Sequence, residues 1–227
     1  MNISIVIPTY NEEAAIGKLL AYLQQHSSPS TEIILADGGS TDATRSIAAG
    51  LGVQVLPCVR KGRGPQMNAG AAVATGDVLY FLHADTFPPA GFEEQIRLAV
   101  KQGKGSGCFR LKFDVPHWFL RANAWFTRFD VDAIRFGDQS LFVRRDLFKK
   151  AGGFDERLLL LEDQEIIRRL RQLAPFVVLP YHVLTSARKY TQHGVYKIQT
   201  GYFLIYTLYR LGVSQQWLVE VYKWLLR

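Results

Sequence analysis

A histidine and a carboxylate, His83 and Asp85, follow directly on the apolar run of residues 78–82. A buried strand that stops there would place both side chains at the carboxyl edge of a sheet, where open α/β folds bind their ligands. Residues two apart on a strand share a face, so both side chains could reach one ion. Nitrogen and oxygen ligands suit a divalent metal and, with it, a phosphorylated substrate. His83 could equally be an ordinary hydrogen-bonded histidine at that edge.

Two further polar segments follow apolar runs. Residues 8–12 (PTYNE) come after the first run, where Tyr10 could cover a planar base and a helix start would favour an anion. Asn11 acting as a simple helix cap explains the same segment. Asp37 ends the second run. Its carboxylate could accept hydrogen bonds from a base or a ribose, or could merely close an Asp–Gly turn.

A basic glycine loop, residues 62–65 (GRGP), precedes Gln66 and Asn68. Glycines let backbone amides approach a phosphate, and the guanidinium of Arg63 would add a charge-assisted fork. The loop matches neither the P-loop nor the dinucleotide-binding pattern. A solvated turn is therefore the alternative interpretation.

The elements that would position these groups alternate between strand and helix. Apolar runs predict strands at residues 3–8, 32–37, 53–56 and 78–82. Caps and helical spacing predict helices that begin near residues 11, 40, 65 and 92. This alternation predicts an α/β fold with a doubly wound, mostly parallel sheet and helices on both faces.

The pattern changes after residue 107. Strands are predicted at 109–113, 140–143 and 176–179, and helices at 118–130, 145–150, 166–173 and 195–226, the last interrupted near Gly212. The C-terminal stretch mixes aromatic and basic residues. It could pack on the rest of the domain, or it could contact a bilayer interface or a lipid-phosphate acceptor.

Composition narrows the classes of partner. The chain has 227 residues, 48% of them hydrophobic, and a formal charge of +7. Phosphorylated small molecules and anionic lipid fit that charge, whereas the absence of long like-charge runs and zinc-finger patterns argues against nucleic acid. Residues 1–4 lead straight into a strand pattern without the features of a signal peptide, and Cys58 and Cys108 have no metal-type spacing. We therefore expect free thiols in a cytoplasmic protein, for which the inner face of the membrane is one location that fits the charge.

Six segments together resemble the family 2 glycosyltransferases. Segments 5–12, 37–42 and 83–85 are similar to the three N-terminal motifs of that family, and segments 137–139, 152–155 and 162–163 extend the match in the family's order. The nearest likeness is to a small bacterial subgroup with HADT in place of DxD and a GRGxQMNAG loop. The resemblance implies a GT-A fold and a reaction that inverts the anomeric centre. The donor would be a sugar linked to a nucleotide diphosphate, UDP or GDP. The acceptor is unknown, and a lipid-linked acceptor is one option.

The resemblance also implies a role for individual residues. Asp163, with Glu162 beside it, falls on the general base, and Asp85 falls on the carboxylate that holds Mn²⁺ or Mg²⁺, with His83 as a second metal ligand. Asp138 and Gln139 fall on the acceptor side. The donor-binding positions are Pro8, Thr9, Tyr10, Glu12, Asp37, Arg63, Gln66, Asn68, Ala84 and Asp85.

Such parts meet the needs of the reaction. A metal and an arginine can stabilise the charge that develops on the departing diphosphate. A carboxylate on the opposite side of the sugar must accept the proton of the acceptor hydroxyl. Without the other motifs, Glu162 and Asp163 would be read as acidic residues that favour the first turn of a helix.

Two departures from the family pattern bear on these roles. Ala36 replaces the first acidic residue of the usual DDGS, which leaves Asp37 to contact the nucleoside alone. His83 replaces the first acidic residue of DxD and would favour Mn²⁺ over Mg²⁺. Both changes also fit a non-catalytic module that binds a nucleotide sugar or a lipid phosphate. A nucleotidyltransferase, the other alternative, would normally carry a glycine-rich loop where this chain has Thr9–Glu12.

The chain is expected to form a single glycosyltransferase domain. Residues 1–104 would form the half that binds the nucleotide sugar, residues 105–190 the acceptor and catalytic half, and residues 191–227 a C-terminal helical segment. Acceptor selection is expected in the region 109–137.

Overall fold

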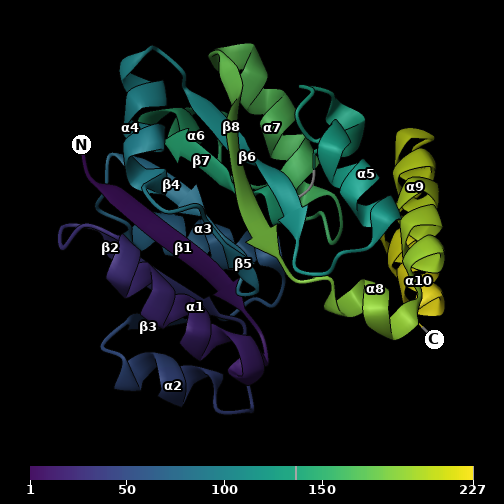
Figure 1. Ribbon diagram of the computed structural model, residues 1–227, viewed down its shortest axis with the longest axis horizontal. Coiled ribbons are helices and arrows are strands. Elements are labelled where there is room, and N and C mark those ends of the chain that lie inside the picture. Colours follow the sequence, from purple (N-terminus) through teal and green to yellow (C-terminus); the bar gives the residue numbers. More distant parts are fainter. Residues whose placement is uncertain (136, 227) are drawn as a thin grey trace.

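The computed structural model describes residues 1–135 and 137–226, and within them one mixed sheet of eight strands is flanked by helices (Figure 1). The strands are β1 (Ile3–Thr9), β2 (Glu32–Asp37), β3 (Gln54–Pro57), β4 (Val78–Phe81), β5 (Thr86–Phe87), β6 (Ser106–Phe113), β7 (Leu141–Arg144) and β8 (Phe176–Thr185). The helices are α1 (Glu13–His26), α2 (Thr44–Gly50), α3 (Arg63–Val73), α4 (Phe92–Lys101), α5 (Trp118–Phe126), α6 (Arg145–Ala151), α7 (Glu162–Leu173), α8 (Arg188–His193), α9 (Val195–Arg210) and α10 (Gln215–Leu225), with 3₁₀ turns η1 (Asp132–Ile134) and η2 (Gly137–Gln139).

The strand order is β3-β2-β1-β4-β7-β6-β8-β5. Strands β3, β2, β1 and β4 are parallel, β7 is antiparallel to both β4 and β6, and β6 is parallel to β8. The predicted mostly parallel α/β sheet is therefore confirmed. The carboxyl ends of β1, β2 and β4 meet at one edge, as the sequence analysis required.

Helices cover both faces of the sheet because its central strands are apolar on both sides. Ile5 of β1 packs in the cluster that α1 and α4 complete, whereas its neighbour Val6 faces the cluster that contains Met67 of α3. A Cβ on Gly70 of α3 would collide with the Val6 side chain. Helix α3 therefore approaches the sheet closely at Gly70.

Three local predictions were wrong for identifiable reasons. Asn11 does not cap α1, because it adopts a left-handed backbone (φ 54°) and its Oδ1 accepts a hydrogen bond from the amide of Thr41. Helix α2 begins at Thr44 rather than near residue 40, where Ser40 instead donates its hydroxyl to Asp37. Strand β8 runs on to Thr185, because its whole length pairs with β6 and its end pairs with β5.

The C-terminal helices pack on the catalytic domain. Ile198 of α9 is buried in the main core, and Ile205 forms a smaller cluster with Leu218 and Leu225 of α10. The predicted interruption is confirmed at Gly212, which has a φ of +83° between α9 and α10. None of the described helices combines the length and apolar character needed to cross a bilayer.

Candidate active site

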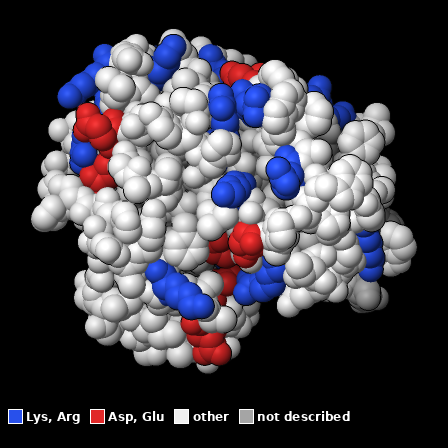
Figure 2. Space-filling view, viewed as in Figure 1, with Lys and Arg blue, Asp and Glu red and all other residues white. Residues whose placement is uncertain are grey.

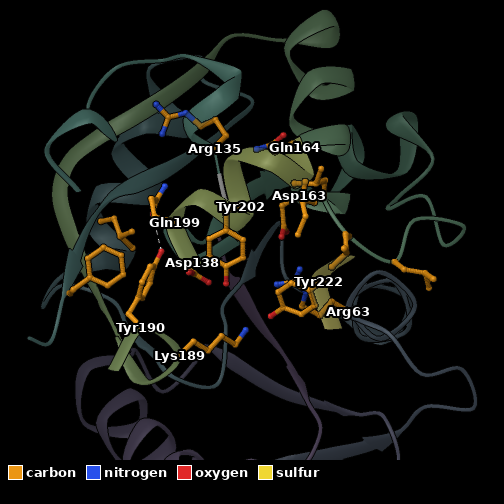
Figure 3. Close-up of a pocket in the computed structure, with 17 residues that line it drawn as sticks. Arg63, Arg135, Asp138, Asp163, Gln164, Lys189, Tyr190, Gln199, Tyr202 and Tyr222 are labelled. Atoms are coloured by element: carbon orange, nitrogen blue, oxygen red, sulfur yellow. Dashed lines mark hydrogen bonds between the residues drawn. The ribbon is translucent and has the colours of Figure 1, made fainter. Parts of the chain in front are cut away.

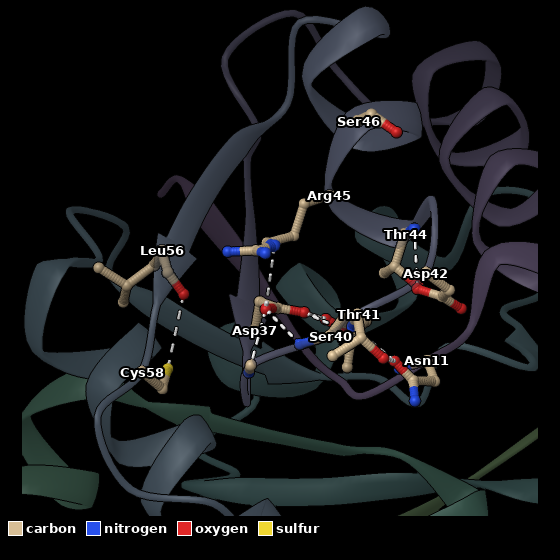
Figure 4. Close-up of polar contacts among 12 residues, drawn as sticks. Asn11, Asp37, Ser40, Thr41, Asp42, Thr44, Arg45, Ser46, Leu56 and Cys58 are labelled. Carbon is tan, nitrogen blue, oxygen red and sulfur yellow. Dashed lines mark hydrogen bonds and ion pairs between the residues drawn. The ribbon is translucent and has the colours of Figure 1, made fainter.

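Asp37 organises the edge of β1 and β2 from inside the protein (Figure 4). Its carboxylate is fully buried, and it accepts hydrogen bonds from the amides of Gly39 and Ser40 at 3.1 and 3.0 Å and from the Ser40 hydroxyl at 2.5 Å. Thr9 donates its hydroxyl to the same carboxylate at 3.4 Å, and Arg45 forms a 3.7 Å ion pair with it. These bonds are those of a carboxylate that closes a loop. A contact between Asp37 and a nucleoside remains a prediction.

Gln66 and Asn68 form hydrogen bonds from α3 to backbone groups of other segments. Gln66 is 4% exposed and donates both amide hydrogens, to the carbonyl of Thr9 at 2.6 Å and to that of Ala36 at 2.7 Å. Asn68 accepts from the amide of Phe154 at 2.8 Å and donates to its carbonyl at 2.9 Å. The sequence indicated neither set of contacts.

The remaining donor-side positions differ in exposure. Pro8 is buried within β1, and Ala84 is buried in the main core. Tyr10 is half exposed, and the Lys61 ammonium lies 5.1 Å from the centre of its ring. Glu12 pairs with Arg188 at 3.2 Å, which ties the start of α1 to α8.

His83 and Asp85 do not lie on a strand. Strand β4 ends at Phe81, and a turn follows in which the amide of Thr86 donates to the carbonyl of His83. The rule that residues two apart share a face therefore does not apply here. His83 Nδ1 lies 3.1 Å from Asp138 Oδ1, whereas Asp85 lines a separate recess of about 220 Å³ between α1 and α8. The strand geometry from which a shared ion was inferred is therefore absent, and joint ligation by His83 and Asp85 remains a prediction.

A divalent metal would have one hard ligand from this turn. Among the described residues, no group of three or more histidine, cysteine or acidic side chains is arranged to hold an ion. Asp85 is partly exposed, and its side chain accepts only a long hydrogen bond, 3.5 Å, from Thr86. A single available carboxylate fits a metal that takes most of its ligands from substrate phosphates and water.

Two carboxylates open α7. Glu162 and Asp163 are 1% and 6% exposed, and they follow Leu161, whose left-handed backbone (φ 66°) turns the chain into the helix. Arg63 Nε lies 2.7 Å from Glu162 Oε1, so α3 and α7 meet at this ion pair. Burial raises the pKa of Glu162, Arg63 opposes that shift, and the negative charge of Asp163 adds to it.

Gly137 lies between the side chains of His83 and Asp163. A Cβ at this position would lie 2.6 Å from His83 Cε1 and would overlap the Asp163 carboxylate. Only a glycine backbone therefore fits between the two side chains. Burial would lower the pKa of His83, but the hydrogen bond to Asp138 outweighs it and raises that pKa. The same bond lowers the pKa of Asp138 to about 2, against the opposing effect of burial.

These groups border a cavity of about 340 Å³ (Figure 3). Asp163, Asp138 and Arg63 lie around it, while Gln139, next in the chain, instead donates to the carbonyl of Phe109 at 3.1 Å. Most of the remaining wall comes from the segment before α7 and from the C-terminal helices. The main contributors are Leu159, Leu160, Leu161, Gln164, Lys189, Tyr190, Gln199, Tyr202, Ile205 and Tyr222.

The C-terminal helices thus complete this cavity, whereas acceptor selection was expected in the region 109–137. That region contributes Leu111, Phe113, Arg135 and Gly137. Burial raises the pKa of the Tyr202 hydroxyl, which keeps this group neutral. The regular spacing of Tyr202 and Ile205 along an aromatic helix was the available signal, but it does not reveal what the helix covers.

Charge is concentrated beside this site. Figure 2 shows acidic side chains gathered in the middle of one face, between α1 and α8, with basic side chains on either side. Arg188 lines the recess that holds Asp85, and Lys189 lines the cavity that holds Asp163. The first turn of α8 therefore presents positive charge to both hollows.

Residues 4–150 match the family model described as glycosyl transferase family 2, and the chain belongs to that family. A PGL/p-HBAD biosynthesis glycosyltransferase of Mycobacterium tuberculosis is 30% identical over 203 residues, which cover 84% of this chain and 77% of that protein. The protein is accordingly an enzyme, and its reaction is glycosyl transfer.

Solved structures share the fold. A mannosyltransferase from Pyrobaculum calidifontis, in complex with GDP-Man and Mn²⁺, aligns with a TM-score of 0.73 at 17% identity, over 89% of this chain and 61% of that one. TarS 1–349 from S. aureus aligns with a TM-score of 0.68 at 20% identity, over 87% of this chain and 64% of that one. The chain thus spans somewhat less than two thirds of each of these structures.

Proposed function

We propose that the protein is an inverting glycosyltransferase that moves a sugar from a UDP- or GDP-linked donor to a hydroxyl of an acceptor in the cavity, with Asp163 as general base. The observation that carries this proposal is the placement of Asp163. Its carboxylate is 6% exposed and stands in the cavity wall, with Arg63 nearby. A nearly dry carboxylate beside an enclosed hollow is suited to take a proton from a bound hydroxyl.

The neighbours of Asp163 divide the work. Glu162 forms an ion pair with Arg63. We therefore assign to Glu162 the role of positioning the Arg63 side chain. The cations of Arg63 and Lys189 stand in the cavity wall, where they would stabilise charge on a departing diphosphate. The acceptor oxygen would bond to the anomeric carbon of the sugar as its proton passes to an oxygen of Asp163. The bond from that carbon to the diphosphate would break on the opposite face of the sugar, and the diphosphate would leave with the electron pair.

Asp85 is the residue that we propose would hold Mn²⁺ or Mg²⁺. When bound, such an ion would neutralise part of the charge on the diphosphate. Helix α8 connects the recess that holds Asp85 to the cavity, because Arg188 lines the recess and the next residue, Lys189, lines the cavity. The related folds that contain GDP-Man with Mn²⁺, and UDP-GlcNAc, support a nucleotide-sugar donor.

A thermal-shift series with UDP and GDP, each with and without Mn²⁺, tests the donor side. We expect one nucleotide to raise the melting temperature of the wild type, and to do so only with Mn²⁺ present. Asp85→Ala should lose the metal-dependent part of that rise. If the melting temperature of Asp85→Ala still rises fully with nucleotide and metal, the assignment of the metal to Asp85 is wrong. If neither nucleotide raises the melting temperature of the wild type, the proposed donor class is wrong.

We also propose that the outer surface of the C-terminal helices contacts an anionic membrane. Phe203, Trp217 and Trp224 are 70%, 69% and 67% exposed, and the basic residues Lys197 and Lys223 lie on the same helices. Aromatic and basic side chains together suit a bilayer interface. Co-sedimentation with vesicles that contain phosphatidylserine should retain the protein at low salt, and recovery of all protein in the supernatant would reject this contact.

A further inference from the structure

Gln164 is a buried amide that has no hydrogen-bond partner in the part of the chain that the structure describes. Its side chain lines the cavity, the residue is 3% exposed, and neither Oε1 nor Nε2 forms a hydrogen bond with any residue in 1–135 or 137–226. Gln66 is buried to the same extent, at 4% exposure, yet donates two short hydrogen bonds to carbonyls. Burial alone therefore does not explain the state of Gln164.

An unpaired buried amide is costly. Leaving such a group without partners destabilises the folded protein, because the group is hydrated in the unfolded chain. A leucine or methionine of similar size would fill the same space without this cost. Both amide atoms are almost fully covered in the free protein, so the side chain must turn toward the cavity to meet an occupant. A ligand group that pairs with the amide then accounts for its presence, because the hydrogen bonds are made in the complex.

The position of Gln164 in the cavity indicates the chemical features of such a ligand. It directly follows Asp163 in the first turn of α7, and both side chains line the same cavity. Around them the wall is mainly aromatic and aliphatic, formed by Leu111, Phe113, Leu160, Tyr190, Tyr202 and Ile205. The occupant therefore carries a polar group near Asp163 and an apolar body elsewhere.

We propose that Gln164 selects the acceptor by forming hydrogen bonds with a hydroxyl next to the one that reacts. A vicinal hydroxyl both donates and accepts, as the carboxamide does. The acceptor class is then a vicinal diol, as on a sugar ring, joined to an apolar group that fills the rest of the cavity. This inference rests on the proposed function, because it places the reacting hydroxyl at Asp163.

Hexyl β-D-glucoside is a probe with both features. Its binding is followed by thermal shift, with glucose and 1-hexanol as controls that carry one feature each. We expect a saturable rise in the melting temperature of the wild type with hexyl β-D-glucoside, and at least tenfold weaker effects of either control. The absence of a rise, or an equal rise with 1-hexanol alone, would overturn the proposed acceptor class.

Gln164→Leu and Gln66→Leu form a matched pair. Gln164→Leu should leave the melting temperature of the free protein unchanged or raise it, and should weaken hexyl β-D-glucoside binding at least tenfold. Gln66→Leu should lower the melting temperature, because it strands two buried carbonyls. The inference fails if Gln164→Leu still binds the probe normally, or if it destabilises the free protein as much as Gln66→Leu does.

The nucleotide shift separates this inference from the function on which it rests. Gln164→Leu should keep the wild-type response to UDP or GDP with Mn²⁺, because Gln164 lies on the acceptor side. A wild type that binds nucleotide but not the glucoside refutes only the acceptor assignment. A wild type that binds the glucoside but no nucleotide refutes the donor chemistry instead.

Discussion

The edge of β1 and β2 and the cavity beside α7 treat their polar groups in opposite ways. At the strand edge, Asp37 and Gln66 use their polar atoms on neighbouring backbone and hydroxyl groups. Beside the cavity, Glu162 has Arg63 as its ion-pair partner. In the cavity wall, Gln164 has no hydrogen-bond partner among the described residues. The first region pairs its polar groups within the protein, whereas the second leaves an amide for the ligand that we propose.

The largest expected effect is on the base. Asp163→Asn keeps the shape of the side chain but removes its ability to accept a proton, so transfer should fall by about 10²–10⁴-fold. Nucleotide binding, measured by thermal shift, should persist. Glu165→Gln is the matched control, since Glu165 sits on the same helix but pairs with Arg169 outside the cavity wall. An unimpaired turnover rate in Asp163→Asn would remove this residue from its role.

The contrast also explains what could be predicted from the sequence. The strand edge is built from short segments in which an apolar run and its polar end are contiguous, so the position of Asp37 could be predicted. Its bonds to Gly39 and Ser40 are local, but its burial depends on packing that no local pattern contains. The pair Glu162–Asp163 was found through the family resemblance rather than through any local pattern.

The cavity was only partly predictable, because it joins segments distant in the chain. Nothing local links Arg63 to Glu162, or His83 to Asp138, 55 residues further on. The tyrosine-lined wall depends on α9, far along the chain, reaching the cavity with Tyr202 and Ile205. Gln164 could not be distinguished in the sequence from any polar residue in the first turn of a helix, because its significance lies in the partners that it lacks.

Breaking the ion pair between Arg63 and Glu162 should make the stability of the protein depend on pH. In Arg63→Met the buried Glu162 loses the cation that holds its pKa down, so its pKa rises further. A raised carboxyl pKa penalises the folded state as pH rises through it, so the variant should lose more stability at pH 8 than at pH 5. Because Arg63 is itself partly exposed, we expect about 1–3 kcal/mol at pH 8 from chemical denaturation.

Arg157→Met provides the control for that measurement. Arg157 pairs with Asp155 at 2.8 Å but is 89% exposed, so its loss should leave the stability of the protein almost unchanged. Equal losses in the two variants, or a loss in Arg63→Met that does not grow with pH, would show that Glu162 is not charged in the folded protein.

Gly137→Ala tests how tightly the cavity side is fitted. The added methyl group would displace His83 or Asp163. A shift of about 1 Å at a reacting group can cost as much as 10²-fold in rate, so transfer should fall by about 10- to 100-fold. Gly50→Ala is the control, because a Cβ there meets nothing within 4 Å. Full activity in Gly137→Ala would mean that the Asp163 side chain is free to move without loss.

The smallest effect concerns His83 and Asp138, which the site holds as a charged pair. The pKa of His83 is raised above 6.5 and that of Asp138 is lowered from 3.8 to about 2. The histidine contribution to stability is fully present below pH 6.5 and is lost as pH rises through the raised pKa. The aspartate contribution is present above pH 3.8 and is lost as pH falls towards 2. The pair therefore stabilises most between about pH 4 and 6.5.

His83→Gln should lower the free energy of unfolding by about 0.5–1 kcal/mol at pH 5.5, since Asp138 is 42% exposed, and by less at pH 9. Denaturant unfolding of both proteins at the two pH values measures the difference. A larger loss at pH 9 than at pH 5.5 would mean that the histidine is neutral where it meets Asp138. The cavity would then contain one positive charge fewer beside Asp163, which would leave Arg63 and Lys189 to stabilise the departing diphosphate.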